Sequence, residues 1–84
     1  MPKLEKRRIN LSDLHQGQAR INLSQEYLAK ASEIAGVGRE VILTGAAPVW
    51  MYLKIAHSLH GKVTTLKYDS PSTGEILIFD HNPW

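Results

Sequence analysis

The segment 40–69 constrains the fold of this chain more than any other part of the sequence. EVILTG (40–45) is a short, nearly all-apolar run, which is typical of a central strand covered on both faces. A helical segment follows, with Pro48 suited to its first turn and Gly61 placed just past its end. KVTTLKYD (62–69) is then a strand rich in β-branched residues. These elements predict a βαβ unit with two parallel strands and a right-handed crossover.

The front of the chain predicts a hairpin. LEKRRINL (4–11) contains a weak alternating run, and ARINL (19–23) is a second short strand. The segment SDLHQGQ between them is polar, with Gly17 as its natural pivot. His15 is isolated in this turn, and the sequence assigns it no role.

A helix and a closing strand complete the prediction. Ser24 is a good N-cap for the helix 25–34, which Gly36 and Gly38 end. Its expected apolar stripe is Tyr27, Leu28, Ala31, Ile34 and Ala35. After the turn SPSTG, EILIFD (75–80) is the last strand. We therefore expect a single small α/β domain over residues 1–84, with a mixed sheet and the order β-β-α-β-α-β-β.

Length and composition restrict the classes of protein. With 84 residues, the chain buries a modest fraction of its surface, so oligomerisation is a reasonable expectation. Cysteine is absent, which excludes disulfides, thiolate chemistry and thiolate metal sites. The net charge of +2 and the pI of about 9.1 are weak evidence for an anionic partner. Positive charge gathers at the front, on Lys3, Lys6, Arg7 and Arg8, and is typical of either a solvated edge strand or a phosphate-attracting patch.

The sequence also predicts where the protein works. The start MPKLEKRR is charged and is not followed by the apolar run of a signal peptide. No stretch has the apolar length that spans a bilayer. We expect a cytoplasmic protein with no membrane partner and no double-stranded DNA partner.

Two histidines lie three residues apart on the second predicted helix. At about 100° per residue, its apolar stripe is expected to include His60, with His57 and Trp50 on the flank. The rest of this stripe comprises Val49, Tyr52, Leu53, Ala56 and Leu59, and Met51, Lys54 and Ser58 are expected to point away. A pair at i and i+3 can hold a metal ion or supply an acid and a base, whereas a hydrogen-bonded core histidine is the structural alternative.

The strand–helix junction 44–48 is a second candidate. Its small residues let a ligand approach the backbone, and amides at a helix N-terminus can bind phosphate; a tight turn is the alternative. Asp69 ends the parallel strand and is expected at the same sheet edge, whereas Asp80 and His81 are expected at the opposite edge. Turn capping is the alternative role for each aspartate. Within one subunit, His60 and Asp69 need not meet, although a symmetric interface could join them from two chains.

Residues 40–81 carry the motif of a known family. VILTGAAPVWMYLKIAHSLHG followed by LKYDSPSTGEILIFDH resembles the small CRISPR-associated ring nucleases of the third numbered Csx family. The positions that carry the resemblance are Gly45, Pro48, Val49, Trp50, His57, His60, Asp69, Gly74 and His81.

The resemblance implies a function and a site. It implies a ferredoxin-like α/β fold resembling cyclic-oligoadenylate sensor domains, and cleavage of cyclic tetra-adenylate that switches off type III CRISPR signalling. It further implies dimers or higher oligomers, manganese dependence, and catalytic roles for His60 and Asp69, with Asp69 as the metal ligand. The expected ligand-binding residues are Thr44, Gly45, Ala46, Ala47, Trp50 and His57.

The sequence departs from the family pattern at two positions, and two further hypotheses stand beside the ring nuclease. Ala46 stands where the family has a basic residue, and the arginine expected just after Asp69 is missing. Lys67, Lys62 and Arg39 are the candidates to replace these cations.

The first hypothesis is a metal-dependent phosphodiesterase with His60 as general acid or base. In it, a ribose 2′-hydroxyl or a metal-bound water attacks the phosphate, and Asp69 ligates the metal or orients the histidine. The second is a binding module that holds the ring without cutting it, and a small assembly subunit without ligand is a third.

Overall fold

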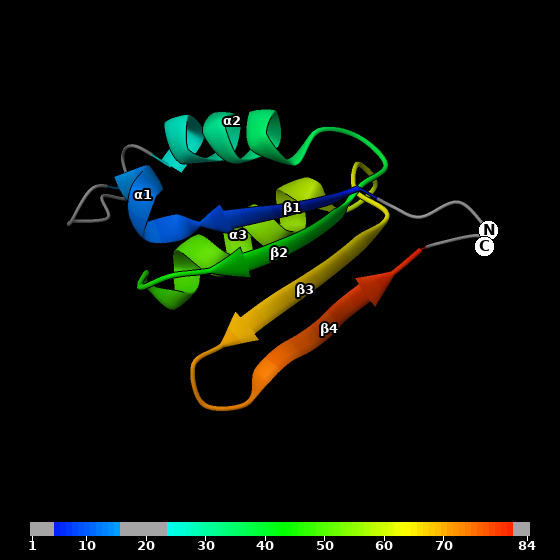
Figure 1. The fold of residues 1–84 in the computed structure, drawn as a ribbon. Helices are drawn as coiled ribbons and strands as arrows, with labels where there is room; N and C mark the ends of the chain where they lie inside the picture. The colour runs from blue at the N-terminus through cyan, green and yellow to red at the C-terminus, as the bar shows by residue number, and fades with distance from the viewer. Residues whose placement is uncertain (1–4, 16–23, 82–84) are drawn as a thin grey trace.

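Four strands form one mixed sheet in the computed structural model, which describes residues 5–15 and 24–81. They are β1 (Lys6–Asn10), β2 (Glu40–Thr44), β3 (Thr65–Ser70) and β4 (Gly74–Asp80), and they lie in this order across the sheet (Figure 1). β1, β2 and β3 are parallel, and β4 runs antiparallel to β3. The predicted α/β domain with a mixed sheet is therefore confirmed, as are the parallel strands of the βαβ unit.

β2 is the central strand that its apolar sequence predicted. It lies between β1 and β3, and Val41, Ile42 and Leu43 are all buried. Successive side chains of a strand point to opposite faces, so a buried run of three requires cover on both sides of the sheet.

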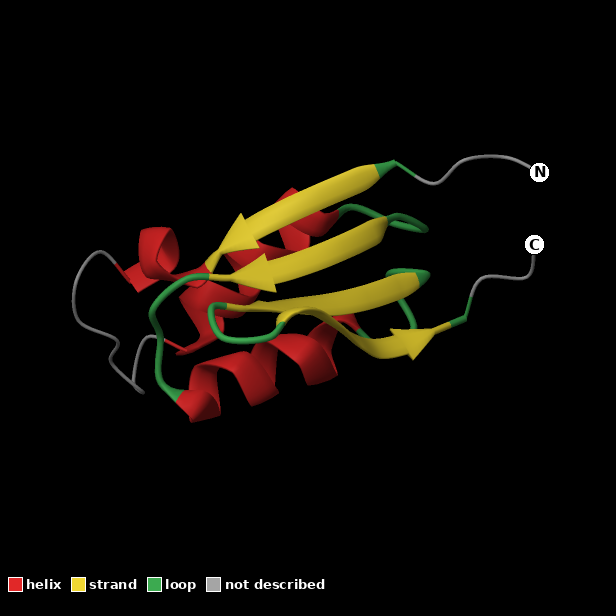
Figure 2. Ribbon diagram, turned by 60° about the horizontal axis from the view of Figure 1, so that its bottom comes forward, coloured by secondary structure: helices red, strands yellow, loops and turns green. Residues whose placement is uncertain are grey.

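The helices lie on one face of the sheet (Figure 2). They are α1 (Leu11–His15), α2 (Ser24–Ala35) and α3 (Val49–Leu59), and α2 packs against both α3 and β1. α2 buries Tyr27, Ala31 and Ala35 from its predicted stripe. Ile34, expected in the same stripe, is 42% exposed, so the buried face of α2 is narrower than predicted. No helix in the described ranges has the length and apolarity needed to cross a bilayer.

The first strand of the predicted front hairpin is confirmed as β1, but the turn expected after it is wrong, because helix α1 (Leu11–His15) stands there. β1 leads directly into helix α1, and it pairs in parallel with β2, whose residues follow it by 34 positions (Lys6 opposite Glu40). α1 forms because Asn10 Oδ1 accepts a hydrogen bond from the Ser12 amide at 3.0 Å. Leu11 and Leu14, three residues apart, are then both buried. The expected strand 19–23 and Gly17 lie outside the described residues.

The expected ferredoxin-like order is not confirmed. In the described residues the elements follow one another as β1, α1, α2, β2, α3, β3, β4, rather than as β-β-α-β-α-β-β. Three neighbouring strands in chain order are parallel, which places their carboxyl ends at one edge of the sheet.

The predicted apolar face of α3 is only partly correct. Leu59 is buried as expected, and Tyr52 and Ala56 pack against the core, but Val49 and Leu53 are 72% and 65% exposed. Met51, expected to point away, is buried, as is Ile55. Apolar residues surround most of the circumference of VWMYLKIAHSL, so periodicity did not determine which side packs on the sheet. His60 follows the last turn as its C-cap and is exposed rather than part of a buried stripe.

Candidate functional site at the carboxyl edge of the sheet

A pocket of about 610 Å³ lies at the edge of the sheet where β2 and β3 end. It is lined by Thr44, Gly45, Ala46 and Ala47 from the β2–α3 junction, Tyr52 from α3, and Tyr68, Asp69 and Pro71 from β3 and the turn after it. The structure therefore brings four of the predicted ligand-binding residues together with Asp69. This is where ligands bind in open α/β sheets, beyond the carboxyl ends of parallel strands.

Gly45 gives the junction its shape. Its φ of +101° lies in a region that L side chains rarely adopt. A Cβ there would collide with the Asn10 side chain and lie 3.1 Å from the Leu11 amide nitrogen. The junction therefore packs directly against the β1–α1 turn, and this close approach requires glycine.

Two tyrosines, Tyr52 and Tyr68, form one wall of the pocket. Their rings meet edge to face with centroids 5.0 Å apart, and the Tyr52 hydroxyl donates to the Gly45 carbonyl at 2.5 Å. Burial raises the pKa of Tyr52, and the nearby Tyr68 and Asp69 raise it further. The phenol therefore remains a protonated donor at neutral pH. The sequence places Tyr52 in the apolar stripe of the helix and gives no sign of a role at the site.

His15 also contacts the junction. Its Nε2 donates to the Ala46 carbonyl at 2.8 Å, from helix α1. The sequence gives His15 no role, because the polar segment around it predicts a turn between two hairpin strands. Only the parallel pairing of β1 with β2 puts the end of β1, and hence α1, beside the β2–α3 junction.

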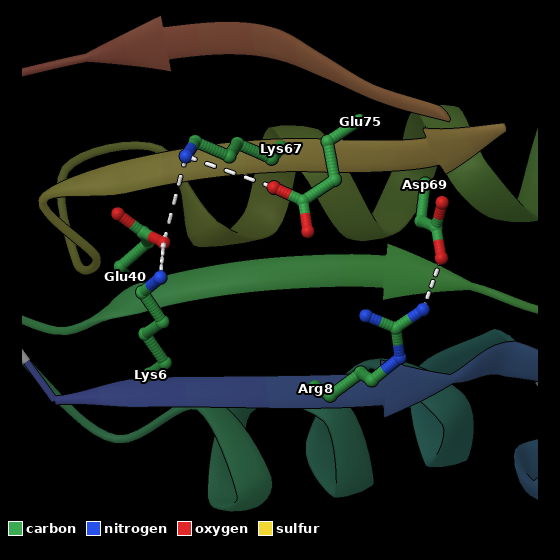
Figure 3. Close-up of polar contacts among 6 residues, drawn as sticks. All are labelled: Lys6, Arg8, Glu40, Lys67, Asp69 and Glu75. Carbon is green, nitrogen blue, oxygen red and sulfur yellow. Dashed lines mark hydrogen bonds and ion pairs between the residues drawn. The ribbon is translucent and has the colours of Figure 1, made fainter. Parts of the chain in front are cut away.

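Arg8 forms an ion pair with Asp69 on the face of the sheet opposite the helices (Figure 3). The Arg8 side chain starts from β1 and crosses β2 to reach Asp69 on β3. Ile42 lies opposite Arg8 in the register and is buried, because long side chains cover it on this otherwise open face.

The other candidate cations are engaged elsewhere. Lys67 lies 3.6 Å from Glu40 and 3.8 Å from Glu75 (Figure 3). Arg39 pairs with Glu5 at 2.9 Å, and Lys62 donates to the Ser32 carbonyl at 2.8 Å. None of these three lines the pocket or is paired with a residue that does, so the structure gives no support to the expectation that they replace the missing arginines. Arg8 does not line the pocket either, but its partner Asp69 does. Arg8 is the cation that contacts a pocket residue.

His60 lies at the opposite edge of the sheet. Its Nε2 is 3.2 Å from the Nε2 of His81, which follows β4, and its ring packs edge to face on Phe79. The His81 amide donates to the Thr64 carbonyl, just before β3 begins, so Asp80 and His81 are at the predicted edge. Asp69 is at the far end of β3. One chain therefore does not bring His60 and Asp69 together.

The other two predicted ligand-binding residues also lie away from the pocket. His57 is exposed in the last turn of α3. Trp50 is partly buried and faces α2, where it lies with Ser24, Tyr27 and Leu28 around a small crevice.

A manganese ion at Asp69 does not fit the described part of a single chain. No group of three or more potential metal ligands occurs among residues 5–15 and 24–81. Asp69, the expected ligand, already pairs with the Arg8 guanidinium.

The fold is that of a small α/β domain, with a pocket at the carboxyl edge of its parallel strands. The family model for CRISPR-associated protein (Cas_csx3) matches residues 17–84. The chain belongs to this family. Comparison with curated proteins gave no match, and comparison with solved structures gave none either. β1 and α1, which end at His15, lie before the matched range.

Proposed function

We propose that this protein binds a cyclic oligoadenylate, cyclic tetra-adenylate in the first instance, and cleaves it to switch off type III CRISPR signalling in the cytoplasm. The observation that carries the proposal is the pocket that joins the residues 44–47 to Asp69. Membership of a CRISPR-associated family supports the biological setting.

The β2–α3 junction is suited to phosphate. The carbonyls of Gly45 and Ala46 accept hydrogen bonds from Tyr52 and His15. In a trans peptide the N–H points opposite to the C=O, so the amides of Ala46 and Ala47 point away from these two side chains. Both residues line the pocket just before the N-terminus of α3, where the helix dipole favours an anion. We propose that these amides bind ligand phosphate.

His60 is the proposed general acid or base. In the reaction, a ribose 2′-hydroxyl attacks the adjacent phosphorus, the bond to the 5′-oxygen breaks, and the products carry a 2′,3′-cyclic phosphate and a 5′-hydroxyl. An imidazole takes the 2′-hydroxyl proton or gives one to the leaving oxygen. Since His60 lies at the other edge of its own sheet, the imidazole at each pocket must come from a second copy of the chain.

An apolar groove beside α3 supports such a second copy. Val49 and Leu53 on α3 face Ile78 on β4 across a hollow of about 270 Å³, which is lined almost entirely by carbon. Val49, Leu53, Ile76 and Ile78 are all more than 40% exposed. A contiguous apolar patch of this kind marks an interaction surface. We propose a homodimer or a higher homo-oligomer that buries this groove.

A non-catalytic binding module is the alternative. It is favoured by the separation of His60 from Asp69 and by the ion pair that holds the Asp69 carboxylate. A sensor or sponge requires the pocket but not an acid–base group next to it.

One experiment separates these functions. The protein is incubated with radiolabelled cyclic tetra-adenylate, the products are resolved, and thermal shifts are measured with rings of three to six adenylates. Cleavage supports the ring nuclease. A raised melting temperature without cleavage supports the binding module, because a bound ligand stabilises the folded state. The absence of both cleavage and a thermal shift with every ring would contradict both functions.

A further inference from the structure

We propose that Arg8 is the phosphate-binding cation of the carboxyl-edge pocket, and that its guanidinium holds the place at Asp69 where a divalent metal was expected. The identity of the ligand in this proposal rests on the proposed function. The anion-binding role of Arg8 is a separate claim, and it can be tested separately.

The position of Arg8 follows from the register of the sheet. Arg8 is opposite Ile42, and Ile42 is opposite Lys67, so Arg8 and Asp69 are on strands separated by β2. The Arg8 side chain crosses β2 toward the end of β3 (Figure 3). The guanidinium is not part of the pocket lining, but the carboxylate that it pairs with is, so the guanidinium lies one side chain away from the pocket.

Arg8 retains donors for a ligand. A guanidinium has five N–H groups, and Asp69 is its partner among the described residues, through Nη2. The Arg8 side chain is 53% exposed, so about half of its surface is open to solvent. Arginine matches the geometry of phosphate oxygens and can bind two of them at once. Asp69 therefore orients the guanidinium while leaving part of it free for an anion.

The neighbouring cations do not meet these conditions. Lys6 is on the same face of β1, two residues earlier, but it lies 3.7 Å from Glu40 at the other end of the strand. Lys67 is shared between Glu40 and Glu75. Arg8 is thus the cation of this face whose acidic partner belongs to the pocket.

The same ion pair accounts for the poor fit of a metal at Asp69. The guanidinium neutralises the carboxylate, and no set of three potential ligands surrounds it in the described ranges. The fixed positive charge of Arg8, a residue of β1, takes the place of a bound divalent metal ion. It also replaces the basic side chain absent at Ala46, and it comes from a strand that precedes the family match at residues 17–84.

The first test is equilibrium binding of cyclic tetra-adenylate at several salt concentrations with EDTA present. We expect Arg8→Ala to bind about 10- to 100-fold more weakly, the usual effect of losing hydrogen bonds to a charged group. The slope of log affinity against log salt should fall by about one ion. Arg8→Lys should retain the slope but not the full affinity. Lys6→Ala is the matched control, on the same strand and face, and should bind like the parent.

The second test does not depend on the nucleotide. Inorganic pyrophosphate is titrated into the full-length protein while the side-chain Nε–Hε signals of arginine are followed by NMR, with Arg8→Gln assigning the Arg8 signal. Thermal melting of each variant confirms folding. We expect the Arg8 signal to shift more than that of Arg39. If the Arg8 signal shifts although no cyclic oligoadenylate binds, the proposed function fails and the role of Arg8 stands. If the parent binds the ring but Arg8→Ala keeps the parent affinity and salt slope, or if pyrophosphate leaves the Arg8 signal unmoved, the role of Arg8 is overturned.

Discussion

The two edges of the sheet carry different parts of the proposed site. At the carboxyl edge, the pocket residues are held by neighbours from β1, α1 and α3, through Asn10, His15 and Tyr52. At the opposite edge, the imidazoles of His60 and His81 contact each other and Phe79, and both remain exposed. One edge carries the pocket, whereas the other carries two exposed imidazoles. Binding and cleavage should therefore be separable by mutation.

Replacing His60 should have the largest effect, and it tests whether cleavage can be lost while binding is kept. We expect His60→Ala to lower single-turnover cleavage of cyclic tetra-adenylate by roughly 100- to 10,000-fold, the range for loss of a general acid or base. Binding should be retained, because the pocket lies at the other edge. His57→Ala, three residues earlier on the same exposed helix end, is the control and should cost less. Equal cleavage rates for His60→Ala and the parent would leave His60 as a structural residue and favour the binding module.

A side chain at Gly45 should destabilise the carboxyl edge of the sheet. Gly45→Ala introduces a Cβ at a φ of +101° that also collides with the Asn10 side chain. We expect a loss of about 2 to 4 kcal/mol in the free energy of unfolding, measured in urea. Gly61→Ala is the control, because its φ is +85° but nothing lies within 4 Å of the added Cβ. Its cost should be closer to about 1 kcal/mol, from backbone strain alone. Equal costs at the two glycines would show that the contact with the β1–α1 turn is unimportant.

The apolar groove tests whether a second copy joins the two edges. Leu53 is exposed, so Leu53→Asp should barely change the stability of an isolated chain but should weaken self-association by tenfold or more, on the order of 1.4 kcal/mol. Sedimentation at several protein concentrations measures the effect. Ile34→Asp, at an exposed isoleucine on α2, is the matched control. A parent that remains monomeric at high micromolar concentration contradicts the proposed oligomer.

The smallest expected effect concerns Tyr52. Tyr52→Phe removes the hydrogen bond to the Gly45 carbonyl and should cost about 1 kcal/mol in the free energy of unfolding. The folded-state pKa of Tyr52 is raised above 10.0, so folding favours the neutral phenol. Its contribution is therefore fully present below pH 10 and is lost as the pH rises through the folded-state pKa. Tyr52→Phe should flatten this alkaline decline in urea unfolding, and an unchanged profile would contradict the shifted pKa.

The sequence predicted the later elements well because local signals define them. Pro48 and Gly61 bound α3, Ser24 begins α2, and the apolar run 40–44 is the central strand. The pocket at the β2–α3 junction followed from the same βαβ unit, since the ends of parallel strands share an edge.

The predictions that failed concern strand pairing and the buried face of a helix, which only tertiary contacts determine. β1 pairs with a strand far along the chain, and nothing local to residues 6–10 specifies this partner. The buried face predicted for α3 was partly wrong because several faces of the helix are apolar. The sequence indicated Arg8 only as one member of a basic cluster and gave His15 no role, because the position of both depends on where β1 lies. The spacing of Leu11 and Leu14 was the one available sign of a helix there.

The parallel pairing of β1 has a consequence for how far the folding unit extends. The family match starts at residue 17, but the sheet starts at Lys6. A chain cut to the matched range would expose the β1-facing edge of β2, and with it the unpaired amides and carbonyls of a flat, apolar strand. Such an edge is a template for pairing with other chains. Residues 5–15 therefore cover this edge of β2, and we expect a chain without them to aggregate more readily.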